Sequence, residues 1–223
     1  MDTTRKMLAE AIGTFFLCFA GIAAIVNAQN NLLGVALAHG IALSVAVSIF
    51  AGISGGHVNP AVTLGFLATG RIKLPLALLY IVSQLVGATL AALACKWMFP
   101  ADAVAAANLG IPLPAEWVSL PVLLVTEAIL TFLLITAIFG TAVDERAKRM
   151  KIGGFAVGLT VTFDILAGGP VTGASMNPAR SFGPALVQGY FDWHWCYWVA
   201  PIVGAVVAAL VFEHVLLKKD DGD

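Results

Sequence analysis

The tripeptide Asn-Pro-Ala occurs twice in the chain, at 59–61 and at 177–179. Asn is a preferred N-cap and Pro is favoured at the first helical position, so each triplet predicts the start of a helix. The two predicted helices, Pro60–Thr69 and Pro178–Gln188, have about ten residues each and would reach about 15 Å, half of a roughly 30 Å hydrocarbon core. Paired short segments in matching halves indicate a site at the bilayer midplane.

Composition indicates a membrane protein. The chain is 60% hydrophobic and 11% charged, whereas soluble domains average about 25% charged residues. Its net charge of −1 gives no basis for binding nucleic acid. Cys18, Cys95 and Cys196 lie in or beside apolar segments, and their spacing predicts neither a zinc site nor a disulfide framework. We therefore expect no metal and no cofactor.

Six apolar segments mostly approach or exceed the roughly 20 residues of a spanning helix. They are Met7–Val26, Leu32–Ile53, Leu74–Met98, Leu120–Thr141, Ile152–Leu166 and Trp195–Leu217. The fifth is the weakest, because Asp164 interrupts it and Gly-Gly-Pro follows. The first resembles a signal peptide in following Arg5 and Lys6. Its apolar run, however, exceeds the usual length of about 7–15 residues and contains Glu10, so we predict a retained helix.

Basic residues predict the orientation. If all six segments span, ten of the twelve Lys and Arg residues fall on one side: Arg5, Lys6, Arg71, Lys73, Arg146, Lys148, Arg149, Lys151, Lys218 and Lys219. The loops on the other side hold none. The positive-inside rule then places both termini in the cytoplasm. The first short helix would enter from the cytoplasmic face and the second from the outer face.

The two halves of the chain resemble each other. The segment at Glu10 (EAIGTFF) matches the segment at Glu127 (EAILTFL), 117 residues later, and the two triplets are 118 residues apart. Three spans per half is an odd number, so the second half must lie inverted relative to the first. We predict an all-α membrane protein with one channel domain, 1–223. It would consist of inverted repeats 1–110 and 111–223, with Pro100–Pro121 as the connector.

These features together resemble the aquaporin family. The resemblance is carried by the duplicated triplet, the paired Glu10 and Glu127, the segment Ser54–Thr63 (SGGHVNPAVT) and the segment Asn177–Pro184 (NPARSFGP). It covers nearly the whole chain. Membership implies a right-handed bundle of six tilted transmembrane helices and two re-entrant half-helices, assembled as a homotetramer with one pore per subunit.

Residue chemistry independently favours a pore. The N-terminus of each half-helix behaves like roughly half a positive charge, and both ends would meet at the bilayer centre. Asn59 and Asn177 could cap their helices with the carbonyl oxygen and offer amide hydrogens to a water molecule. The preceding loops, Gly55–Val58 and Gly173–Met176, must be non-helical at membrane depth. Such backbone is tolerated only where it is buried in protein or lines a wet cavity.

The resemblance also implies a selectivity filter. A cation at membrane depth indicates function, and Arg180 lies in the first turn of a half-helix, where the dipole disfavours positive charge. Arg180 can also bind loop carbonyls there. The implied ring is His39, Ile165, Ala174 and Arg180. A shift of one residue would put Asp164 or Leu166 in place of Ile165. The ring differs from the Phe, His, small residue and Arg of water-only relatives and resembles the plant vacuolar-membrane branch.

Other polar residues receive supporting roles. Glu10 and Glu127 are buried acids, which in the family accept hydrogen bonds from the re-entrant loops. His57 is expected to border the cytoplasmic vestibule. Asp164 is expected to cap loop groups near Gly168, or to pair with a group that the sequence does not identify. An interfacial aromatic belt is predicted from Trp193, Trp195, Tyr197 and Trp198.

We therefore predict a passive water channel that also passes ammonia, excludes protons and ions, and lies in the lipid bilayer of the plasma membrane. Glycerol is disfavoured, because Ser181 and Ala185 stand where glycerol-conducting relatives usually carry an Asp and a basic residue. An ion-coupled transporter is the main alternative, with Glu10, Glu127 or Asp164 as carriers. An intramembrane enzyme is the third. It is not favoured, because no nucleophile–base pair, metal cluster or phosphate loop is evident.

Overall fold

The computed structural model describes residues 2–27, 31–148 and 152–217, and these are helical apart from their connections. The long helices are α1 (Thr3–Asn27), α2 (Leu32–Ser54), α4 (Leu74–Met98), α6 (Leu120–Ile138), α8 (Gly153–Thr172) and α10 (Cys196–Val211). The shorter elements are α3 (Pro60–Ala68), α5 (Ala101–Ala106), η1 (Asn108–Gly110), α7 (Glu145–Lys148) and α9 (Pro178–Gln188). Helices α6 and α10 continue into the π-helical turns η2 (Phe139–Val143) and η3 (Phe212–Leu216).

Within the described residues, six helices are long and apolar enough to cross a membrane. Their outward faces carry large aliphatic side chains such as Ile41, Val82 and Val125, each of which is more than half exposed. The inward faces of α1, α4 and α10 carry mostly small residues. An exposed apolar surface of this extent is expected of a protein that has lipid as its solvent.

Glycines allow the closest helix crossings, and they occur in matching pairs. A side chain on Gly87 of α4 would collide with the carbonyl of Ala11 in α1, and one on Gly204 of α10 would collide with that of Ala128 in α6. Each pair is repeated at an interval of 117 residues. Small residues at such crossings let helix backbones approach closely in a membrane. The two halves therefore pack by the same contacts.

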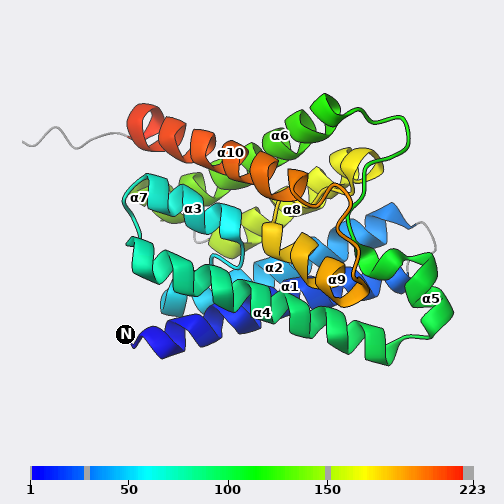
Figure 1. Ribbon diagram of the computed structural model, residues 1–223. Coiled ribbons are helices and arrows are strands. Elements are labelled where there is room, and N and C mark those ends of the chain that lie inside the picture. The colour runs from blue at the N-terminus through cyan, green and yellow to red at the C-terminus, as the bar shows by residue number, and fades with distance from the viewer. Residues whose placement is uncertain (1, 28–30, 149–151, 218–223) are drawn as a thin grey trace, which may run out of the picture.

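The half-helices α3 and α9 lie inside the bundle, towards opposite ends. Figure 1 shows α3 (cyan) near the end that holds the N-terminus and α9 (orange) nearer the end that holds α5. Their N-terminal caps meet, because the Asn59 amide reaches the loop before α9 and the Asn177 amide reaches the loop before α3. This arrangement is that of two re-entrant half-helices.

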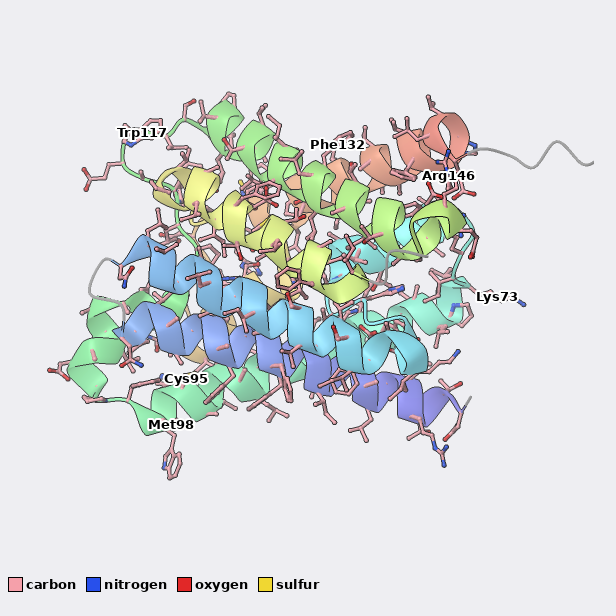
Figure 2. The ribbon with its side chains drawn as sticks, turned by 180° about the vertical axis from the view of Figure 1, so that it is seen from behind. Lys73, Cys95, Met98, Trp117, Phe132 and Arg146 are labelled. Carbon is pink, nitrogen blue, oxygen red and sulfur yellow. The ribbon has the colours of Figure 1, made fainter. Side chains whose placement is uncertain are left out.

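Charged side chains mark one end of the bundle. In Figure 2, Lys73 and Arg146 lie at the end opposite to that of Met98 and Trp117. Arg146 donates to the Asp144 carboxylate at 2.6 Å, which holds the pKa of Asp144 below its ordinary value. At the same end, Arg71 pairs with Glu213 at 2.7 Å.

The described residues do not include every basic residue on which the predicted orientation rests. Arg149, Lys151, Lys218 and Lys219 lie outside the described residues. The segment 28–30 between α1 and α2 does so as well.

One sequence-based boundary was wrong. The fifth span does not end at Leu166, because α8 continues to Thr172 through Pro170. Proline in the last turn removes only one backbone hydrogen bond, and the helix ends at Gly173, whose φ of 80° is left-handed. The segment Pro100–Pro121, which we predicted as the connector between the halves, has structure of its own. It contains α5 and η1, and η1 contacts α1 and α9.

Candidate pore and selectivity filter

Each Asn-Pro-Ala triplet starts a half-helix as the capping rule predicts. The Asn59 side-chain oxygen accepts from Ala61 N at 2.8 Å. The Asn177 oxygen accepts from Ala179 N at 2.9 Å and from Arg180 N at 3.2 Å. Proline occupies the first turn of both helices. The oxygen of each Asn is therefore used as a cap, and its amide group is left for other partners.

The two amide groups brace the loops against each other. Asn59 Nδ2 donates to the Met176 carbonyl at 2.9 Å, and Asn177 Nδ2 donates to the Val58 carbonyl at 3.0 Å. Val58 and Met176 have φ angles of 45° and 53°, in the left-handed region that is costly for a branched residue such as Val. Each amide group has a second hydrogen, which remains for a molecule in the pore.

Glu10 of α1 holds the first re-entrant loop. One carboxylate oxygen accepts from Ser54 Oγ at 2.6 Å and from His57 N at 3.0 Å. The other accepts from Val58 N and from Gln84 Nε2, both at 2.7 Å. Glu10 is fully buried, so these four donors take the place of its hydration.

Glu127 of α6 holds the second loop in the same way with one donor fewer. It accepts from Thr172 Oγ1 at 2.6 Å, Ser175 N at 3.0 Å and Met176 N at 2.8 Å. It is also fully buried. Since the oxygens of both acids are engaged by loop donors, neither acid is arranged as a mobile ion carrier.

Sequence reasoning missed the tyrosines that support these loops. Tyr80 donates its hydroxyl to the Ser54 carbonyl at 2.7 Å, and Tyr197 donates to the Thr172 carbonyl at 2.6 Å. Their separation of 117 residues was a signal that could have revealed the pair. Tyr197 is 1% exposed, so its assignment to the interfacial belt was wrong. Trp193 and Trp195 of that belt are exposed.

Trp198 is partly buried and donates to Nε2 of His194 at 3.0 Å. Burial lowers the pKa of His194, which keeps the imidazole neutral and able to accept this bond.

A cavity of about 210 Å³ lies inside the bundle. Its lining includes Phe66 of α3, Val143 of η2 and the two cap residues Asn59 and Asn177. All four predicted filter residues line it: His39, Ile165, Ala174 and Arg180. His57 also lines it, with its ring 4.6 Å from that of Phe66. The structure thus brings the predicted residues to one passage.

Arg180 is held by the connector between the two halves. Its Nη1 donates to the Gly110 carbonyl in η1 at 2.6 Å, and the residue is 3% exposed. Among the described residues Nε has no hydrogen-bond partner. The guanidinium is therefore anchored at one edge and retains an unused donor beside the cavity.

His39 presents a defined tautomer. Its Nδ1 lies 2.9 Å from the Val35 carbonyl. A carbonyl only accepts, so Nδ1 must carry a proton, and in the neutral imidazole Nε2 is then an acceptor. Nε2 has no partner among the described residues. Ile165, an apolar side chain, lines the same cavity.

Asp164 is not part of the cavity lining. It is fully buried, and neither carboxylate oxygen has a hydrogen-bond partner in the described part of the chain. The expected capping of groups near Gly168 is therefore not observed. Ile165, rather than Asp164 or Leu166, is the residue of α8 that lines the cavity at this level.

The comparisons with known proteins agree with this architecture. The model of the major intrinsic protein family matches residues 1–212. Aquaporin TIP4-4 of Zea mays is 44% identical over 98% of this chain and 92% of its own length. Aquaporin TIP2-1 of Arabidopsis thaliana is 40% identical over 99% and 91%. The X-ray structure of the aquaglyceroporin from Plasmodium falciparum matches with a TM-score of 0.88 over 96% of this chain and 97% of that one, and its 23% identity supports the fold alone.

Six spans, two half-helices meeting at their N-terminal caps, and the matching family model define a membrane channel, and the chain belongs to the major intrinsic protein family. Within that family it is an aquaporin similar to the plant TIP proteins. It is an integral membrane protein that acts as a channel and not as an enzyme.

Proposed function

We propose that the chain is a passive water channel that also conducts ammonia and excludes glycerol, ions and protons. The observation that carries this proposal is the single cavity lined by both Asn caps and by His39, Ile165, Ala174 and Arg180. Pore width, lining donors and acceptors, and electrostatic barriers together determine the selectivity of such a channel.

Charge exclusion is supported by the half-helices. The N-termini of α3 and α9 meet at the middle of the cavity, and each contributes roughly half a positive charge. Arg180 adds a full charge at the filter. The free amide hydrogens of Asn59 and Asn177 would orient a central water with its oxygen towards them. A proton could then pass only by reversing that water.

Ammonia conduction is supported by the composition of the ring. Ile165 makes one wall apolar, and Ala174 adds little bulk. His39 Nε2 supplies an acceptor and Arg180 Nε a donor. Ammonia is about the size of water, so desolvation at the ring rather than width separates the two. In a partly apolar ring a permeant molecule has fewer hydrogen-bonding groups to match, so the ring discriminates less between water and ammonia.

The proposal includes a homotetramer with both termini in the cytoplasm, and repeats that meet near residue 110. The proposal also covers the membrane in which the channel is located. The relatives carry the name TIP, for tonoplast intrinsic protein, and they favour a vacuolar membrane over the plasma membrane that we expected from the sequence.

Stopped-flow light scattering on reconstituted vesicles tests the water function. We expect a high osmotic permeability with a low activation energy of about 5 kcal/mol, because water moves along lining groups without a conformational cycle. Flux that saturates with solute, or that stops when a proton gradient is dissipated, would contradict a passive channel.

An ammonium jump on the same vesicles tests the ammonia function through internal alkalinisation. The double variant His39→Phe/Ile165→His should lower the ammonia-to-water ratio, because it replaces the apolar wall with a polar ring. Glu116→Gln, an exposed change outside the helices, is the control. An unchanged ratio in the double variant would show that these residues do not form the filter.

A further inference from the structure

One turn of α1 forms the wall behind the filter. Leu17 lines the cavity. Cys18 packs in one apolar cluster with Ala179, the residue before Arg180 in α9, and Gly21 lies against the imidazole of His39. Residues 17, 18 and 21 share one face of a helix, because side chains three and four positions apart lie together. The same helical turn therefore lies behind His39 and beside the segment that carries Arg180.

Gly21 is in close contact with His39. A Cβ atom built on Gly21 would lie 2.6 Å from both Cδ2 and Cε1 of His39, and nearer still to Nε2. Real Cβ atoms essentially never approach another heavy atom within 3.0 Å. Gly21 is in the middle of α1 with no positive φ. The backbone conformation therefore does not require glycine here, and the position of the imidazole does.

The two repeats distribute volume differently at this position. Ile138 and Val157 follow Gly21 and His39 by 117 and 118 residues, the offsets that relate the two halves, and they pack in one apolar cluster. Both also line the cavity. In the first repeat the larger side chain, His39, is on α2 and faces Gly21 of α1. In the second repeat the larger side chain, Ile138, is on α6, and the smaller Val157 is on α8. The side-chain volume at this contact is therefore divided differently in the two repeats, which indicates that the small size of Gly21 compensates for the large size of His39.

An added methyl group on Gly21 would push the imidazole towards the lumen. Nδ1 of the ring is hydrogen-bonded to the Val35 carbonyl of its own helix. The far end of the ring, which carries Nε2, is the part that faces Gly21. The far end can turn away from α1 only by moving into the cavity that His39 lines. Such a movement would narrow the ring and place the Nε2 acceptor in the path of the solute.

We propose that Gly21 is a specificity-determining positioning residue, which sets the aperture and the ammonia-to-water ratio by letting His39 lie recessed against α1. This inference rests on the proposed function. It assigns to α1 a role in selectivity, although α1 supplies no member of the ring.

The test is a double-mutant cycle of Gly21→Ala and His39→Ala in vesicles, with permeability expressed per channel. Gly21→Ala should lower water permeability at least about threefold and the ammonia-to-water ratio at least about twofold. In the His39→Ala background the same change should have little effect on either quantity, because the methyl group then has space. A loss of folded channels lowers both fluxes equally and cannot change their ratio.

Gly52→Ala is the matched control, because no atom lies within 4 Å of a Cβ at that position. An unchanged ratio in Gly21→Ala, or an equal loss in both backgrounds, would overturn the inference. If the wild type conducts neither solute, the proposed function fails, and thermal unfolding then decides the inference. A lower melting temperature for Gly21→Ala only where His39 is present supports the contact, and equal shifts in both backgrounds overturn it.

Discussion

The loop before Asn59 and the loop before Asn177 have matching backbones and different surroundings. Glu10 receives four hydrogen bonds, the fourth from Gln84, whereas Glu127 receives three. At the position equivalent to Gln84, 117 residues later, the chain has Pro201. The scaffold of the pore is therefore nearly symmetric, although the bonds that hold its two halves differ in number.

Selectivity residues break the symmetry far more strongly. The position equivalent to Arg180 is Val62, and that equivalent to His39 is Val157, and all four line the same cavity. The proposed filter is therefore confined to the half of the pore that lies beside α9 and η1. The comparison shows that a duplicated scaffold forms the passage, and under the proposed function the few residues without a like counterpart determine what passes.

Glutamate replacement should have the largest effect. Glu127→Gln replaces one of the two carboxylate oxygens that accept from two backbone N–H groups and a hydroxyl. The change should lower the free energy of unfolding by about 3 kcal/mol. Glu10→Gln should cost more, because it has one donor more. Denaturant titration in mixed micelles measures both, with exposed Glu116→Gln as the control. Equal costs would show that Gln84 adds nothing to the first loop.

Gln84 can be tested directly. Its Nε2 donates to Glu10 at 2.7 Å and to Thr63 Oγ1 at 3.0 Å, while its Oε1 lacks a partner among the described residues. Gln84→Leu should therefore lower the free energy of unfolding by about 1–2 kcal/mol, less than a charged hydrogen bond alone would suggest. Thr89→Val, on the same helix, is the control. A cost as large as that of Glu10→Gln would mean that the loop depends on Gln84 itself.

Arg180→Val should change selectivity and leave water conduction in place. The variant removes the cation and widens the ring, so glycerol or small-cation permeability should rise at least about tenfold, which corresponds to roughly 1.4 kcal/mol in the barrier. Solute-uptake and ion-leak assays on vesicles measure this. Val62→Ala changes the equivalent position of the other half and should leave selectivity unaltered. Should both variants leak alike, the filter is not confined to one half.

Asp164→Asn should have the smallest effect and the opposite sign. Asp164 is buried without a partner in the described part of the chain, and its counterpart in the first repeat is Ala46. The neutral amide should raise the free energy of unfolding by about 1 kcal/mol, because a buried unpaired carboxylate costs more than a buried unpaired amide. Thermal unfolding measures the change, with Thr160→Ala as the control on the same helix. A clear loss of stability would show that the carboxyl has a partner of its own.

Local patterns were sufficient for much of the fold. Hydrophobic runs predicted six spans, and capping chemistry predicted where both half-helices begin, because these properties depend on neighbours in the chain. The end of α8 was missed, since Pro170 and the preceding glycines read as a break. A proline in the last turn costs little when a left-handed Gly173 follows, and only the completed helix shows that.

The sequence by itself determined the membrane class, the repeat and the residues brought to the pore. The tertiary structure alone decided what those residues bind: the Gly110 carbonyl for Arg180, the opposite loop for each Asn amide, and the space at Gly21 for His39. These partners lie on other helices, and a side chain takes its hydrogen bonds from whatever packing brings near. Residue types predict the chemistry of a site, and the geometry of packing decides how it is used.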